Sequence, residues 1–199
     1  MRILLGGILL LALSSPALAQ PASPPLRREL ARATFLVGDW QGTGWTRLGK
    51  DDQPISGTAT GEGRSLLSGL SLGWKSQLRA EQGVMSASDV SLRFRRDSTD
   101  FRASFHAPGH PVQESWARVA DCEASWGIQL PAARADSGDH IRYTIRVDGS
   151  NRLTETGERS EDGGRTWWQF YGAEMAGKSG EGCRASATPA PAPTGREER

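Results

Sequence analysis

Apolar and polar residues alternate with a period of two over three segments, 90–95, 101–106 and 141–148. A β-strand turns successive side chains to opposite faces, so this period indicates strands with one apolar and one polar face. The turn cluster RDSTD, residues 96–100, separates the first two segments and predicts a hairpin between them. The apolar faces consist of Val90, Leu92 and Phe94; Phe101, Ala103 and Phe105; and Ile141, Tyr143, Ile145 and Val147.

Turn signals rich in Gly, Asp and Pro recur along the rest of the chain, about every 8 to 15 residues. This spacing predicts an all-β fold. The polar strand faces show no sign of a second covering layer, and closing the sheet would remove its exposed edges. We therefore expect an antiparallel up-and-down β-barrel of about eight to ten strands, in preference to an open sandwich. The segment LRRELARAT, residues 26–34, predicts a short N-terminal helix with Leu26, Leu30 and Ala31 on one face.

The first 19 residues have the pattern of a secretory signal peptide. Arg2 precedes an apolar run from Ile3 to Leu13, and Ala17-Leu18-Ala19 forms the cleavage site. We expect cleavage after Ala19 and a periplasmic or secreted protein. No later segment is apolar enough to span a membrane. Removal of Arg2 changes the counts of 24 basic and 23 acidic residues to 23 of each, so net charge provides no field that would attract nucleic acid or an anionic membrane. We predict no nucleic-acid partner.

Composition divides the mature chain into three parts. Residues 20–25 form a leader, 26–184 a single barrel domain, and 185–199 a Pro/Ala-rich tail that we expect to be disordered. Cys122 and Cys183 are the two cysteines of the chain. In an oxidising compartment an even pair favours a disulfide, with two free buried thiols as the alternative.

The first predicted strand is FLVGDWQGTGWTRL, residues 35–48, with Gly38 and Trp40 forming a G-x-W motif. Gly42 and Gly44 share the strand face of Trp40, which predicts a large ring packed over them. A short helix before a strand with G-x-W resembles the lipocalin-like (calycin) barrels and, more closely, small bacterial nitrobindin-like barrels. This resemblance implies that Trp40 closes one barrel end. Nitrobindin-like proteins bind haem through a histidine near the chain end, but no histidine follows His140 here, so we predict no cofactor.

The stretch SEDGGRTWW, residues 160–168, fits the S-x-D-x-G-x-T-W pattern of the Asp-boxes found in sialidases. One copy in a chain of this length cannot build a propeller. Asp162, Gly163 and Gly164 suit a tight turn, so we interpret the motif as a structural hairpin. It should direct Trp167 and Trp168 to opposite faces.

Two groups of residues are candidates for chemistry. His106 and His110 could bind a metal with His140, Asp139 or Asp136, but no spacing specifies such a site, and we predict none. Glu155, Glu158 and Glu174 lie on adjacent predicted strands and could do acid–base work if they converged, although pairing with Arg152, Arg159 or Arg165 is the simpler expectation. No established catalytic motif occurs, and we predict no catalytic residues.

Seven tryptophans are the remaining signal, and aromatic side chains commonly line small-molecule pockets. We predict an exported barrel that binds or sequesters a small, largely apolar ligand, and the oligomeric state stays open. Two alternatives are a barrel hydrolase or isomerase using glutamate and arginine, and an envelope protein-interaction module. The predicted ligand-binding residues are Trp40, Phe94, Phe105, Tyr143 and Trp168.

Overall fold

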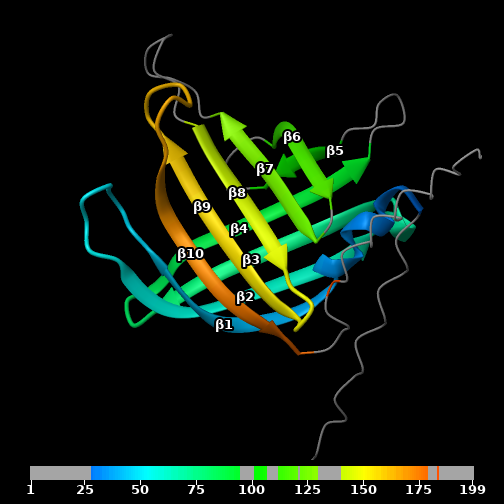
Figure 1. Ribbon diagram of the computed structural model, residues 1–199, viewed down its shortest axis with the longest axis horizontal. Coiled ribbons are helices and arrows are strands. Elements are labelled where there is room, and N and C mark those ends of the chain that lie inside the picture. The colour runs from blue at the N-terminus through cyan, green and yellow to red at the C-terminus, as the bar shows by residue number, and fades with distance from the viewer. Residues whose placement is uncertain are drawn as a thin grey trace, which may run out of the picture.

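The chain forms a closed antiparallel barrel of ten strands, in which each strand pairs with its neighbours in sequence and β1 pairs with β10 (Figure 1). The computed structural model describes residues 28–94, 101–106, 112–120, 122–129, 140–178 and 183. The predicted up-and-down barrel is confirmed. The strands are β1 (Gly38–Thr46), β2 (Ile55–Leu66), β3 (Ser71–Ala80), β4 (Gly83–Phe94), β5 (Phe101–Phe105), β6 (Gln113–Ala120), β7 (Glu123–Gln129), β8 (His140–Val147), β9 (Arg152–Ser160) and β10 (Trp168–Gly177).

The predicted N-terminal helix is present as a 3-10 helix, η1 (Arg28–Leu36). Its buried positions are Leu30, Ala33 and Leu36, because a 3-10 helix has three residues per turn and aligns every third residue. The expectation that Ala31 would share the buried face is therefore wrong: Ala31 is exposed. Leu26 and residues 1–25 lie outside the described residues.

The helix η1 covers one end of the barrel and contacts β2, β3, β4 and β6. Trp40 is buried at this end, where its Nε1–H donates to the carbonyl of Leu36 at 3.3 Å. Side chains that face inward here are almost completely buried, among them Leu72, Trp74, Leu92, Val119, Val147 and Met175. We call this end, which the helix covers, the closed end.

Glycines on β1 and β2 allow close packing, but not in the way that the sequence suggested. A Cβ at Gly42 would meet the backbone of β10, so that glycine accommodates a neighbouring strand and not an aromatic ring. A ring that does lie against a glycine inside the barrel is Trp74, which packs against Gly61 of β2. Sequence reasoning placed the ring on the wrong strand because the partner of a glycine is set by register across the sheet.

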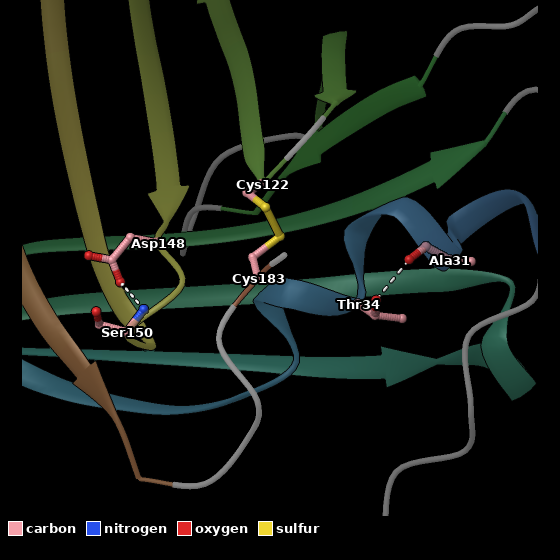
Figure 2. Close-up of a disulfide and its surroundings, with 6 residues drawn as sticks. All are labelled: Ala31, Thr34, Cys122, Asp148, Ser150 and Cys183. Carbon is pink, nitrogen blue, oxygen red and sulfur yellow. Dashed lines mark hydrogen bonds between the residues drawn. A yellow bond between two sulfur atoms is a disulfide. The ribbon is translucent and has the colours of Figure 1, made fainter. Parts of the chain in front are cut away.

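A disulfide joins Cys122, in the turn between β6 and β7, to Cys183, which follows β10 (Figure 2). The predicted pairing is thus confirmed. The bond lies beside η1, so it fastens the end of the chain to the closed end of the barrel. No helix among the described residues has the length and hydrophobicity required to cross a bilayer.

Candidate functional site: the open end of the barrel

At the end opposite η1, several inward-facing side chains are only half-buried. This open end includes the β9–β10 turn and the β1–β2 loop (Figure 1). Strand register aligns Trp126 with Tyr143 and Gly157, and one pair further toward the rim it aligns Ile128 with Ile141 and Arg159. Trp126 is buried, whereas the side chains nearer the rim keep part of their surface exposed. The half-buried inward set includes Ser86, Ser88, Gln113, Ser115, Ile128, Ile141, Tyr143, Arg159, Trp168 and Phe170.

Glu155 lies at the base of this open half, with no exposed surface. It faces inward from β9 between Ile145 and Ala173 of the adjacent strands. Its carboxylate reaches across the lumen to β3 and accepts hydrogen bonds from three buried donors. The indole Nε1–H of Trp74 donates at 3.3 Å, the hydroxyl of Ser76 at 3.1 Å and the hydroxyl of Tyr171 at 3.3 Å.

Burial raises the pKa of Glu155 to about 7, because the charged carboxylate has lost its hydration shell. The hydrogen bonds from Trp74, Ser76 and Tyr171 favour the charged form and oppose that rise. Glu155 therefore carries a proton in a substantial fraction of molecules at neutral pH. A carboxyl of this kind can accept or release a proton inside a lumen of low polarity.

Aromatic rings cover Glu155 on the side of the open end. Tyr143 packs edge-on against Phe170 and Tyr171, with ring centroids 5.8 and 6.4 Å apart, and lies 6.4 Å from Trp126. The pKa values of Tyr143 and Tyr171 are both raised well above the usual range, first by burial and then by the nearby charge of Glu155. Both phenols are therefore neutral donors or acceptors at any physiological pH.

The predicted ligand-binding residues divide between the two ends. Tyr143 and Trp168 line the open half, and Phe105 faces inward from the open-end terminus of β5. Trp40 lies at the closed end under η1. The backbone of Phe94 pairs with Phe101, but the side chain of Phe94 lies outside the described residues.

The three candidate carboxylates do not converge. Only Glu155 faces the lumen. Glu158 lies on the outer wall in a two-pronged ion pair with Arg142, at 2.6 and 3.1 Å, and Glu174 lies outside near Arg152 at 3.6 Å. The expected pairing of Glu174 with Arg152 is thus present. Arg159, the other expected partner, pairs with Glu161 at 3.7 Å.

The Asp-box motif forms the turn between β9 and β10 on the rim of the open end. Asp162 accepts hydrogen bonds from the backbone N–H groups of Arg165 and Thr166 and from the hydroxyl of Thr166. These hydrogen bonds hold the pKa of Asp162 well below its usual range, and the bond from the Thr166 hydroxyl contributes most. Gly163 and Gly164 adopt the positive φ values of 72° and 90° that the turn requires. The structural interpretation of this motif is confirmed.

Ser160 anchors this turn from the end of β9 and is completely buried. Its hydroxyl donates to Asp162 and accepts the N–H of Gly164, both at 2.8 Å. We expect Ser160→Ala to lower the free energy of unfolding by about 1–2 kcal/mol, because the partly buried N–H of Gly164 loses its acceptor. Urea unfolding measures this loss. Ser150→Ala, in the exposed β8–β9 turn, should change stability by less than about 0.5 kcal/mol, and an equal effect of both changes would contradict the assignment.

The two tryptophans of the motif lie on different sides of the wall. Trp167 lies outside, where the guanidinium of Arg142 stacks on its ring 4.2 Å from the centroid and its Nε1–H donates to Gly164. Trp168 aligns with Arg159 in the inward row and packs against Phe170, with centroids 6.3 Å apart. The predicted separation of Trp167 and Trp168 is thus present, with Trp168 toward the lumen.

The two described histidines, His106 and His140, do not line the lumen. His106 lies beyond the end of β5, where a ring nitrogen is 3.2 Å from the hydroxyl of Ser91. His110, Asp136 and Asp139 lie outside the described residues. Two outer concavities of about 550 and 470 Å³ also occur, but they are lined mainly by outward-facing polar residues. In the larger one, Asp39 and Glu62 pair with Arg64, and Lys75 pairs with Asp89 at 3.4 Å.

Sequence reasoning missed most of the residues that line the open half, among them Trp126, Phe170, Ser88 and Ser115. It also grouped Glu155 with Glu158 and Glu174, for which pairing with a nearby arginine was the simpler expectation. The stretch RLTETGERS does contain a signal that Glu155 faces inward. Glu155 lies two residues after Leu153 and two before Gly157, on the strand face that carries the apolar residue. Following the period of two from Leu153 puts Glu155 on the inner face.

Fold and site together define a closed ten-stranded up-and-down barrel with one covered end and one open, aromatic-lined end. The chain matches no known family model and no curated protein. Among solved structures it is similar to the crystal structure of Rv2717c from M. tuberculosis, with a TM-score of 0.57 and 16% identity over 77% of this chain and 99% of that chain. This likeness shows the barrel fold alone, and a place within the lipocalin-like families remains an expectation.

Proposed function

We propose that this protein is an exported β-barrel that binds or sequesters a small, largely apolar molecule in the open half of its lumen. One observation carries the proposal: several inward-facing aromatic and aliphatic side chains near the open rim are half-buried, whereas those at the closed end are buried. The half-buried ones are Ile128, Ile141, Tyr143, Trp168 and Phe170. Covering exposed apolar surface is favourable, and pockets walled by aromatic residues with a few polar groups are typical small-molecule sites.

The polar groups of the lumen narrow the class of ligand. The indole N–H groups of Trp126 and Trp168 are buried and have no acceptor within the described parts of the chain, and the same is true of the Ser88 hydroxyl. A buried donor without an acceptor is costly, and a ligand oxygen would remove that cost. The favoured ligand is therefore an apolar molecule that carries at least one hydrogen-bond acceptor, such as a carbonyl or ether oxygen.

Export rests on separate support. Residues 1–19 have the three regions of a signal peptide, and the Cys122–Cys183 disulfide fits an oxidising compartment. The enzyme alternative is weakened by the placement of Glu158 and Glu174 on the outer wall, because it leaves Glu155 as the only one of the three candidate carboxylates in the lumen.

Filling the lumen tests the proposal. Ser115 faces inward from β6 and is half-buried, so Ser115→Phe should occupy part of the ligand volume. We expect at least a tenfold weaker affinity for an amphipathic fluorescent probe with apolar rings, 1-anilinonaphthalene-8-sulfonate, measured by titration, because a ring in the lumen displaces the probe. Ser125 faces outward from the adjacent strand β7, so Ser125→Phe should leave the affinity unchanged.

Urea unfolding of both variants serves as the control that each is folded under the conditions of the titration. Equal probe affinity in the two variants would contradict binding in the lumen. Native mass spectrometry of the protein isolated from its own envelope should then show an adduct that Ser115→Phe reduces and Ser125→Phe retains.

A further inference from the structure

The turn between β2 and β3 places three leucines on the surface at the closed end. Leu66, Leu67 and Leu70 are 41%, 62% and 46% exposed, and we refer to them as the leucine turn. Leu66 lies along the outer wall against Gly73. Leu67 and Ser68 have φ values of 50° and 55°, in the left-handed region.

This conformation is unfavourable for a side chain as large as leucine, because the Cβ atom crowds the backbone. Leu67 therefore contributes little to the stability of the fold, because its side chain is exposed and its backbone conformation is unfavourable. Strain of this kind is concentrated at positions that make contacts outside the fold. The leucine turn is therefore a candidate contact surface.

Two arginines continue the same outer row. Register aligns Leu66 with Ser71, Ser71 with Arg93, and Arg93 with Arg102. Both arginines are exposed, and neither forms an ion pair with any described part of the chain. Because neighbouring strands are about 4.8 Å apart, Arg93 lies about 10 Å along the wall from Leu66. A long arginine side chain spans much of that distance.

We propose that the leucine turn, Arg93 and Arg102 form a docking surface for an anionic phospholipid membrane. Apolar side chains at the tip of a turn enter the boundary between headgroups and acyl chains, while adjacent cations contact the lipid phosphates. An acidic polypeptide would pair with the arginines without using the exposed leucines, whereas a lipid surface uses both features. This surface lies at the closed end and does not depend on ligand binding in the lumen.

Sedimentation with lipid vesicles tests the proposal on the mature chain from Gln20 onward. We expect the wild-type protein to partition onto vesicles of phosphatidylglycerol and phosphatidylcholine at low ionic strength. The Arg93→Gln/Arg102→Gln variant should reduce that partition about thirty-fold, because each cation near an anionic surface strengthens partition roughly fivefold and the two factors multiply. The Leu67→Ser/Leu70→Ser variant should reduce it about tenfold or more.

Matched controls lie at the open end. Leu48 and Val84 are exposed by 69% and 46%, and Leu48→Ser/Val84→Ser should keep full partition. Arg79→Gln/Arg165→Gln removes two exposed arginines and should also keep it, apart from a small loss through net charge. Equal thermal unfolding of all variants shows that the comparison concerns folded protein.

Three outcomes would overturn the proposal. The wild-type protein could fail to partition onto anionic vesicles. The control variants could lose partition as much as the variants of the docking surface. The protein could bind soluble polyglutamate, with the same dependence on Arg93 and Arg102, while ignoring vesicles, which would assign the surface to an acidic polypeptide partner.

Discussion

The wild-type protein should lose about 2–3 kcal/mol of stability between pH 5 and pH 8 through the titration of Glu155 alone. The folded-state pKa of about 7 exceeds the ordinary value of 4.5, so the folded protein holds a proton that the unfolded chain releases. The contribution of Glu155 to stability is therefore fully present below about pH 4.5 and is lost as the pH rises toward 7. Each unit of pKa difference corresponds to about 1.4 kcal/mol.

Glu155→Gln should remove this dependence, because the amide has the shape of the carboxyl and does not titrate. Urea unfolding of both proteins at a series of pH values gives the difference directly, since all other groups titrate in both. Near pH 5 the two should be similar in stability, and at pH 8 the variant should be the more stable. Glu174→Gln is the matched control, because Glu174 is exposed on the adjacent strand and makes only a long ion pair with Arg152.

A wild-type protein whose stability follows the same pH course as Glu155→Gln would show that the carboxyl does not titrate in this range. Its hydrogen bonds with Trp74, Ser76 and Tyr171 would then keep Glu155 in one protonation state across this pH range. The description of the lumen around Glu155 as an environment of low polarity would then have to be revised.

The architecture of the barrel was predictable from local sequence, because strand and turn signals are local. The alternation in 90–105 and 141–147 specifies which residues face inward, and its phase agrees with the observed register of β4, β5 and β8. The turn at SEDGGRTWW was equally predictable, since Asp162 and its two glycines interact only with residues of the same turn.

The site was less predictable, because its contacts join strands far apart in the chain. Glu155 on β9 meets Trp74 and Ser76 on β3 across the lumen, 81 and 79 residues away. Nothing within RLTETGERS specifies those partners. Sequence reasoning could have placed Glu155 on the inner face but could not have derived its three donors.

A bulge in β10 interrupts the alternation of inward- and outward-facing residues in TWWQFY. Trp168 pairs with Arg159 and Tyr171 pairs with Gly157, so both face inward although three residues separate them. A regular strand would turn residues three apart to opposite faces. The irregularity between Gln169 and Tyr171 absorbs one residue and brings Phe170 against Tyr143 as well. Trp168, Phe170 and Tyr171 of β10 therefore gather with Tyr143 of β8 in a cluster of four rings. Regular alternation would place only two rings of β10 on the inner face.

Removal of the disulfide should have the largest effect on stability of any change considered. The Cys122–Cys183 bond spans 61 residues, which include β7, β8, β9 and β10. Closing a loop of that length restricts the unfolded chain, and the chain-entropy relation gives about 4 kcal/mol of stabilisation. We expect Cys122→Ser/Cys183→Ser to lose about that amount, measured by urea unfolding at one pH.

Reduction provides the internal control. The wild-type protein treated with dithiothreitol should unfold at the same urea concentration as the double variant, and dithiothreitol should not affect the double variant. A loss below about 1 kcal/mol would mean that the unfolded chain is already compact across this span, or that the bond strains the native turn at Cys122, whose φ is 70°. Because the bond lies beside η1 and away from the open end, probe affinity in the lumen should survive its removal wherever the protein remains folded.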